Sequence, residues 1–268
     1  MKFIFYRLDC LTNLHLGSGD ANYDVIDLQV ERDPVLGEPT MNASGVKGAL
    51  RDHCEIALGC QNDPDTNADI KMIFGTRKGG TQQGSYVFFN ADLLARPVRV
   101  SGCDTAWLLA TTPDLINSFV NKLCALGLKC PLVTHMPMEF KDDKVKTTPE
   151  CGKVDKVEGY DTETIPVDSV LSKLLGTDRY AIMSHEMLSS ISLPVQAHNV
   201  LKNGISKNLW YEEYVPHKSV FGLIIGVPGE TDPFADIVKS GNVVQFGAEA
   251  STGCGYIRMT EVEFDEQA

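Results

Sequence analysis

Two side chains near the start of the chain are of types that can take part in acid–base or metal-assisted chemistry. His15 precedes a glycine-rich turn, and Asp27 lies in the apolar extended stretch VIDLQV, where a carboxylate is locally out of place. An aspartate can hold a divalent cation or accept a proton from a hydroxyl group, and a histidine can transfer protons near neutral pH. The chain has no GxSxG, HExxH, P-loop or Rossmann motif that would assign a role to either residue. The residues alone therefore leave a structural role open for both.

A basic helix start is the first candidate for binding phosphate groups. The segment ASGVKGALR puts Lys47 and Arg51 four residues apart, on one face of a predicted helix, with Ser44 positioned to cap it. Two cations beside the free backbone N–H groups of a helix start would hold a phosphate. Asp52 and Glu55 lie nearby, so a solvated helix face remains the alternative.

A second basic stretch, residues 75–80, contains Arg77 and Lys78 between glycines. It lacks the following helix pattern of a phosphate-binding loop. Contact with an RNA backbone and a solvated turn are both consistent with it.

The overall charge excludes a nonspecific coat on nucleic acid. The 268 residues carry 24 Lys and Arg against 36 Asp and Glu, which gives a formal net charge of -12. A local basic groove remains possible, because a phosphate contact depends on nearby charge. At 43% hydrophobic residues the chain can bury a core.

Eight cysteines are scattered without a CxxC or CxxH pair, so we predict no zinc site and expect free thiols in a reducing cytoplasm. No apolar run reaches the ~18 residues of a membrane-spanning helix, and the first residues do not resemble a signal peptide. These patterns predict a cytoplasmic protein with no membrane partner.

Periodicity and punctuation predict a mixture of helices and strands without strict βαβ alternation. This mixture favours an α+β fold with an antiparallel sheet. We expect helices at 44–58, 113–127, 167–175 and 233–240, and strands at 2–12, 85–89, 105–111, 220–227, 242–247 and 255–264. The first strand is apolar on both faces, so we expect it in the middle of the sheet.

Two segments have the character of insertions into a single domain, residues 1–268. Residues 137–164 are polar and charged, with few anchors for a core. Residues 193–211 predict a long hairpin around the turn Lys202-Asn203-Gly204.

Six segments in order resemble the RAMP superfamily of CRISPR proteins, and the repeated backbone subunit of the type III-B (Cmr) effector complex is the best match. The sequence departs from that pattern at Asn42-Ala43, where the family has Pro-Gly, at Asn90, where it has Asp, and after Asp27, where it has a proline. The matching segments are HLGSG, VIDLQVERDPVLGEPTMNASGVKGALR, IFG (73–75), residues 87–116, LWYEEYVPHKSVF (209–221) and FGAEASTGCGY (246–256).

The resemblance implies an RRM-like, ferredoxin-type core with an antiparallel sheet and a β-hairpin thumb. It implies copies stacked along a guide CRISPR RNA, each cleaving the paired single-stranded target RNA with Mg²⁺ or Mn²⁺. The implied partners are these two RNAs, neighbouring copies, and other type III-B subunits including the large signature subunit.

The same resemblance assigns roles to individual residues. Asp27 matches the catalytic aspartate and would be the metal ligand, with His15 and Glu213 as weaker candidates for the same site. The implied RNA-binding residues are Ser44, Lys47, Gly48, Arg51, Arg77, Lys78 and Gly253.

Two alternatives remain within the superfamily. A non-catalytic guide-binding subunit would share the fold without needing an acid at position 27. A stand-alone guide-processing endonuclease would typically use a histidine without metal.

Overall fold

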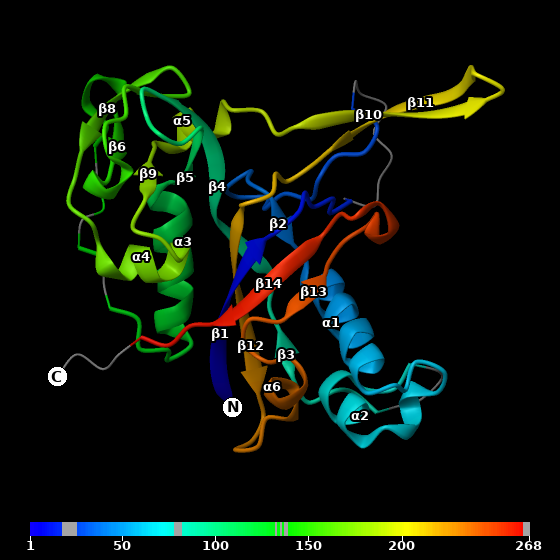
Figure 1. Ribbon diagram of the computed structural model, residues 1–268. Coiled ribbons are helices and arrows are strands. Elements are labelled where there is room, and N and C mark those ends of the chain that lie inside the picture. The colour runs from blue at the N-terminus through cyan, green and yellow to red at the C-terminus, as the bar shows by residue number, and fades with distance from the viewer. Residues whose placement is uncertain (18–25, 78–81, 132, 135, 137–138, 265–268) are drawn as a thin grey trace.

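The computed structural model describes residues 1–17, 26–77, 82–131, 133–134, 136 and 139–264 (Figure 1). Ser18, Gly19 and Lys78, which the sequence analysis singled out, lie outside these residues. No helix in the described residues is long and apolar enough to cross a membrane.

A central antiparallel sheet runs through the molecule. Strand β1 (Lys2–Cys10) pairs with β14 (Tyr256–Glu261) on one side and with β12 (Val220–Val227) on the other, and β12 pairs with β4 (Ala91–Ser101). Beyond β14 lies the edge strand β13 (Val243–Gln245). The prediction that the first strand is central is confirmed.

Helices cover both faces of this sheet. On one face lie α1 (Ala43–Ala57), between β1 and β4 in the chain, α2 (Ala68–Phe74), and α6 (Pro233–Ile237), between β12 and β14. On the other lie α3 (Pro113–Ala125) and α4 (Ser169–Leu175). Two apolar layers therefore form, one on each side of the sheet.

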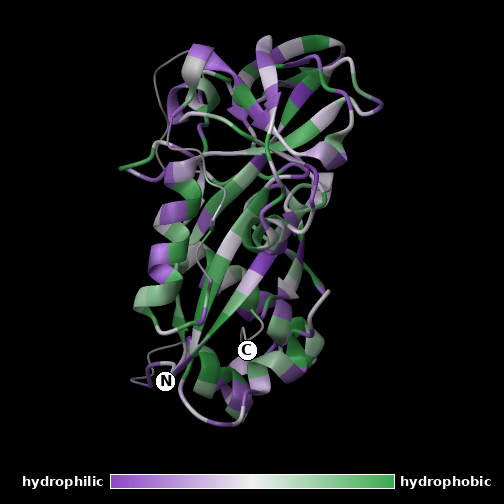
Figure 2. Ribbon diagram, turned by 90° about the vertical axis from the view of Figure 1, so that its left-hand side faces the viewer, coloured by the Kyte–Doolittle hydropathy of each residue, from purple (hydrophilic) through white to green (hydrophobic). Residues whose placement is uncertain are grey.

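Strand β1 contributes to both layers because its side chains alternate. Tyr6 and Leu8 belong to the cluster under α1, and Phe5 belongs to the cluster under α3, 5.1 Å from the ring of Phe119. The apolar residues lie along the central strands and the inward sides of the helices, as Figure 2 shows.

A second set of strands closes into a small ring with the far end of β4. This ring runs from β4 through five further strands and returns to β4 where Val100 pairs with Val157. Its members are β5 (Trp107–Thr111), β9 (Tyr180–Ile182), β6 (Val145–Thr147), β8 (Tyr160–Thr164) and β7 (Lys156–Val157). The core of this part is barrel-like.

The expectation that residues 137–164 hold few core anchors is wrong for their described part. Val145 and Val157 are fully buried and lie in ring strands β6 and β7. Polar neighbours conceal them in the sequence, because each strand is only two or three residues long.

The hairpin is present around the predicted turn, and it begins and ends two residues later than predicted. Strands β10 (Val195–Lys202) and β11 (Ile205–Glu213) form a separate two-stranded sheet that projects from the body (Figure 1). Its turn has positive φ at both Asn203 (52°) and Gly204 (77°), which is typical of a tight hairpin turn.

Some elements differ from the sequence predictions. The long strand β4 and the helices α2 and α5 (His185–Ser189) were not predicted. Asn42, without a side-chain hydrogen bond, is the N-cap of α1, so the expectation that Ser44 caps this helix is wrong. The short remaining elements are β2 (Thr40–Met41), β3 (Val87–Phe88) and the 3₁₀ turns Pro64–Thr66, Lys141–Asp143, Pro149–Cys151 and Ala250–Thr252.

Candidate functional site

Segments far apart in the sequence meet at the base of the hairpin. The backbone N–H of Leu14 donates to Val215 O (2.9 Å), that of Asp27 to Tyr211 O (3.1 Å), and that of Ala248 to His15 O (3.1 Å). The start of the chain, the segment after residue 25, the end of β11 and the loop after β13 therefore share one junction.

Asp27 is half-buried at this junction and is bound to the hairpin of its own chain. Its Oδ2 accepts a hydrogen bond from the backbone N–H of Tyr211 at 2.8 Å. Its Oδ1 has no hydrogen-bond partner among the described residues, so one carboxylate oxygen remains available to a hydroxyl group or a cation.

Glu213 has a carboxylate that is occupied on both oxygens. Oε1 lies 2.6 Å from Arg32 Nη2, and Oε2 accepts from the backbone N–H of Val30 at 3.2 Å. The side chain is buried. These bonds hold residues 30–32 against β11, so the geometry favours a positioning role for this residue.

Glu212, which the sequence analysis passed over, faces the junction. Its Oε1 accepts from Trp210 Nε1 (2.6 Å), and its Oε2 accepts from the Tyr214 hydroxyl (2.7 Å). Burial disfavours the charged form of Glu212, but these two hydrogen bonds and the nearby His198 outweigh it, so the pKa of this carboxyl is lowered. Strand alternation was the available signal, because it places residues 210 and 212 of β11 on one face and residue 213 on the other.

His15 and Tyr214 lie beside this carboxylate. His15 is buried, its Nδ1 is 2.8 Å from Glu213 O, and its ring centroid is 5.5 Å from that of Tyr214. Burial and the bond to Glu212 raise the pKa of the Tyr214 hydroxyl. The structure thus brings His15 to the junction, held by a backbone carbonyl.

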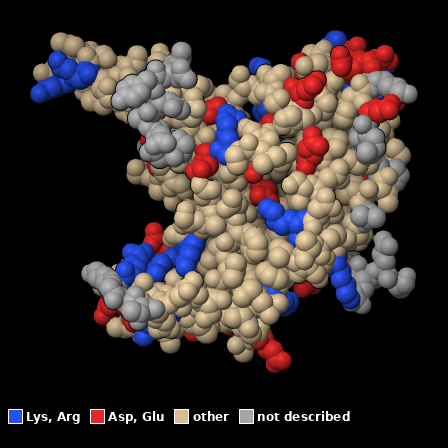
Figure 3. All heavy atoms as spheres, turned by 180° about the vertical axis from the view of Figure 1, so that it is seen from behind, with Lys and Arg blue, Asp and Glu red and all other residues tan. Residues whose placement is uncertain are grey.

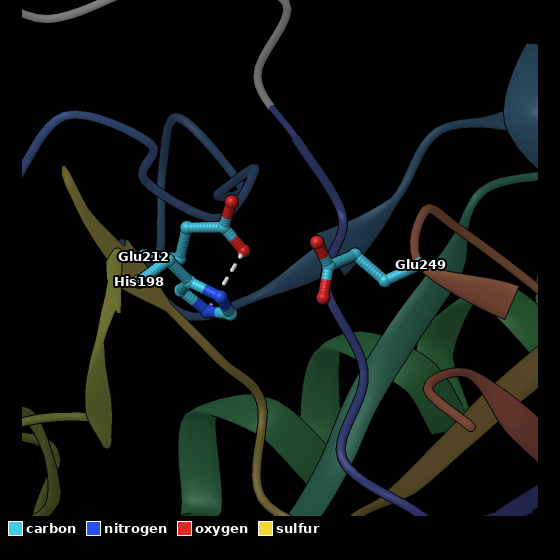
Figure 4. A group of neighbouring side chains, drawn as sticks. All are labelled: His198, Glu212 and Glu249. Atoms are coloured by element: carbon cyan, nitrogen blue, oxygen red, sulfur yellow. Dashed lines mark ion pairs between the residues drawn. The ribbon is translucent and has the colours of Figure 1, made fainter. Parts of the chain in front are cut away.

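Three side chains at the junction form a donor set that could hold a metal ion. The ligand atoms of His198, Glu212 and Glu249 all lie within 4.8 Å of one another, and they converge from β10, β11 and the loop after β13 (Figure 4). No other group of three His, Cys, Asp or Glu of this kind occurs among the described residues. Imidazole with carboxylates suits Zn²⁺ or Mn²⁺. Asp27 is not a member of this group.

The Tyr214 hydroxyl lies among these three side chains. It is 3.0 Å from His198 Nε2 and 3.2 Å from Glu249 Oε2, in addition to its bond to Glu212. The hydroxyl carries one hydrogen, so it can donate to only one of its neighbours at a time. Glu212 and Glu249 therefore compete for this one hydrogen bond.

Two arginines near α1, Arg51 on the helix and Arg77 after α2, are neutralised by acids. Arg51 Nε lies 2.7 Å from Glu55 Oε1, and Arg77 forms ion pairs with Asp52 and, at 3.2 Å, with Glu55. From behind, Lys and Arg over α1 and α2 lie beside Asp and Glu (Figure 3). Only Lys47 of the predicted pair has no ion-pair partner among the described residues. The alternative given above, a face with acids beside its cations, therefore describes Arg51, whereas phosphate binding by Lys47 stays a prediction.

A cavity of about 200 Å³ lies between the start of α1 and the glycine-rich loops, lined by Gly17, Ser44, Gly45 and Gly247 among others. Gly247 has a φ of 74°, and a Cβ on it would lie 2.3 Å from His15 O. Gly48 faces open space on α1, and Gly253 follows the 3₁₀ turn Ala250–Thr252 outside the cavity lining. Backbone groups and small residues thus shape this hollow.

Comparison with known proteins accounts for almost the whole chain. The model of the RAMP superfamily matches residues 7–258. The chain belongs to the RAMP superfamily.

Two Cmr4 proteins are among the relatives that resemble this chain over nearly its whole length. The CRISPR system Cmr endoribonuclease Cmr4 of Pyrococcus furiosus is 26% identical, with 97% of this chain and 96% of that protein covered. The CRISPR system CMR subunit Cmr4 of Saccharolobus solfataricus is 30% identical, with 95% of this chain and 94% of that protein covered.

Solved structures share the fold over the same length. A chain of the type III-B Cmr-beta complex in its apo state has a TM-score of 0.75 at 20% identity and covers 97% of both chains. Oligomeric Cmr4 from Pyrococcus furiosus has a TM-score of 0.68 at 20% identity, covering 99% of this chain and all of that one. The mixed α+β fold is therefore that of Cmr4.

Two departures from the RAMP sequence pattern meet in space. The Asn90 side-chain oxygen accepts a hydrogen bond from the backbone N–H of Ala43 at 2.9 Å. Asn90 and the Asn42-Ala43 pair therefore act together in joining the start of β4 to the start of α1.

Proposed function

We propose that this RAMP chain is a Cmr4-type subunit of a type III-B CRISPR ribonucleoprotein. It binds the guide RNA as a repeated backbone subunit and cleaves complementary target RNA at regular intervals. The convergence of Asp27, His15 and Glu212 at the hairpin base carries the proposal. It places a carboxylate oxygen that is available for chemistry at the foot of the projecting β10–β11 hairpin. The relative from Pyrococcus furiosus, named an endoribonuclease, supports the activity.

In the proposed reaction Asp27 acts on the ribose 2′-hydroxyl of the target. Its Oδ1 accepts the hydroxyl hydrogen, the 2′-oxygen bonds to the adjacent phosphorus, and the bond from phosphorus to the 5′-oxygen breaks. The 5′-oxygen takes up a proton from water as it leaves, so the products are a 2′,3′-cyclic phosphate and a 5′-hydroxyl end. The hydrogen bond from Tyr211 fixes the carboxylate, so its free oxygen is aimed before the RNA arrives.

A divalent ion, Mg²⁺ or Mn²⁺, is proposed as the cofactor. Mg²⁺ usually binds one or two carboxylates and fills its remaining positions with phosphate oxygens and water. Asp27 fits that pattern as one protein ligand, because an ionised carboxylate has about four lone-pair sites, of which the Tyr211 N–H takes one and the 2′-hydroxyl would take a second. When bound, the ion would neutralise charge on the phosphate.

The core is proposed to be of the ferredoxin type. Four strands lie in the order β14-β1-β12-β4, all antiparallel, with α1 and α6 as the crossover helices, and this order supports a βαββαβ unit. We also propose a cytoplasmic location, since all eight cysteines are free thiols, as suits a reducing compartment.

The test is cleavage of a matched target RNA by complex reconstituted with guide RNA, with the other type III-B subunits and with Mg²⁺. We expect evenly spaced cuts that are lost with Asp27→Ala and retained with Asp63→Ala, which removes an exposed loop aspartate. Guide binding without any cutting by the wild type would identify a non-catalytic subunit. Metal-independent cutting of the guide precursor by the isolated chain would identify a processing endonuclease.

A further inference from the structure

A second hollow lies on the face of the sheet opposite α1. It has a volume of about 470 Å³ and is formed by β1, β14, the start of β5 and the turn after α4. Four cationic side chains line it, and among the described lining residues Asp9 is the only acid. They are Arg7, Arg179, Lys218 and Arg258. This concentration is unusual in a chain with a formal charge of -12.

Most of this positive charge is not neutralised. Arg7 pairs with Asp9 at 3.0 Å, whereas Arg179, Lys218 and Arg258 have no ion-pair partner among the described residues. The Nε of Arg179 is buried and has no hydrogen-bond partner in the part of the chain that the structure describes, and its Nη2 bonds there to Thr105 Oγ1 at 3.2 Å. The arrangement is opposite to that at α1, where acids neutralise the arginines.

The hollow also offers an aromatic surface. Trp107 lines it with 40% of its surface exposed, and Lys218 Nζ lies 5.6 Å from its ring centroid. Cations beside an exposed indole are the combination with which proteins bind single-stranded nucleic acid, because phosphates meet the cations and a base stacks on the ring.

A glycine makes room for Arg7 at the base of the hollow. Gly176 closes α4 with a φ of 72°, and a Cβ there would lie 2.4 Å from Arg7 Cζ. The guanidinium of Arg7 therefore packs directly on this glycine, which keeps the space above it open.

We propose that this hollow binds a segment of single-stranded RNA, with phosphates on Arg179 and Arg258 and one base stacked on Trp107. The inference rests on the proposed function only in taking RNA as the ligand. It adds a contact surface on the sheet face away from α1 and apart from the hairpin base.

The test uses the full chain with Trp210→Phe, which leaves Trp107 as the only tryptophan. Titration with hexa-adenylate is expected to quench Trp107 fluorescence, whereas inorganic tripolyphosphate, which has no base, is expected to leave it unquenched. Arg258→Glu should weaken the binding at least about tenfold, and Lys153→Glu, at an exposed position outside the hollow, should not. In calorimetry without the Trp210 change, Trp107→Ala should cost about 5- to 150-fold in affinity, and Trp107→Phe much less.

Absence of quenching, or quenching that Arg258→Glu does not change, would overturn the proposal. Displacement of the RNA by an equal concentration of polyglutamate would also overturn it, in favour of an acidic protein segment. Cleavage by the reconstituted complex is a separate readout. If hexa-adenylate does not quench Trp107 but the complex cleaves its target, only this site is rejected. If Trp107 is quenched but the complex does not cleave, only the proposed function is rejected.

Discussion

At the scale of single residues, the Asp27 carboxylate has two roles. It is the proposed proton acceptor in cleavage, and it accepts the hydrogen bond from the backbone N–H of Tyr211. Asp27→Asn keeps an oxygen for the Tyr211 N–H, so we expect unchanged stability and cleavage at least about 100-fold slower. Asp27→Ala should slow cleavage equally and also lower the free energy of unfolding by about 1 kcal/mol. Single-turnover cleavage and urea unfolding measure the two effects. Cleavage retained by the Asn variant would contradict a role for the carboxylate as proton acceptor.

The lowered pKa of Glu212 predicts that the stability of the folded chain depends on pH. Because its pKa is lowered in the folded chain, its contribution is complete above the ordinary glutamate pKa of about 4.3 and is lost as the pH falls through the lowered value. Glu212→Gln should therefore reduce the free energy of unfolding by about 1–3 kcal/mol at neutral pH and by little in acid. Urea unfolding across this pH range tests it, with Glu230→Gln, at an exposed loop position, as the control. A difference that does not vary with pH would contradict the prediction.

The choice between the adjacent glutamates shows where sequence reasoning reached its limit at this scale. A motif identifies LWYEEYVP as important, but only the strand's face separates Glu212 from Glu213. Asp27 and His15 were singled out because each stands beside an apolar stretch or a turn, and their roles, which came from the family resemblance, stay predictions. The residues of the basic hollow come from positions 7, 179, 218 and 258, and no spacing in the sequence connects them.

At the scale of elements, the hairpin contributes little to the core. Most of its side chains are exposed, and it forms its own sheet. Replacing residues 200–208 by Asn-Gly keeps the pairs Asn199–Leu209 and His198–Trp210, and with them the junction. We expect the shortened chain to melt within a few degrees of the wild type and to lose target cleavage in the reconstituted complex. Unfolding of the shortened monomer would assign the hairpin to the core instead.

Elements with a local signal were predicted, and those that depend on distant partners were not. The hairpin and α3 have clear turns or caps, with Pro113 opening the helix. Strand β4 was hidden by Arg96 and Pro97 in its middle. Arg96 is buried because Glu38 lies 3.4 Å away and the carbonyls of Leu188 and Ile191 accept its hydrogen bonds, and all three partners are remote in sequence.

At the scale of the whole molecule, the distribution of charge decides which cations are available to RNA. An acidic chain can bind a polyanion only where its cations lack acidic partners. At the tip of the hairpin, Lys202 and Lys207 are exposed, and the space-filling view shows basic side chains there (Figure 3). On α1 the acids leave only Lys47 available.

This distribution predicts opposite phenotypes for two cations one helical turn apart. Lys47→Ala should leave the free energy of unfolding unchanged and reduce the slope of log affinity against log salt for guide RNA by about 0.7, one single-strand phosphate contact. Arg51→Ala should leave that slope unchanged and destabilise the chain by about 1–3 kcal/mol, because the Glu55 carboxylate is 3% exposed and loses its closest partner. Filter binding over a salt series and urea unfolding measure both variants. A reduced slope for Arg51→Ala with normal stability would mean that Arg51 leaves Glu55 to bind phosphate when RNA is present, and that the ion pairs seen here belong to the RNA-free chain alone.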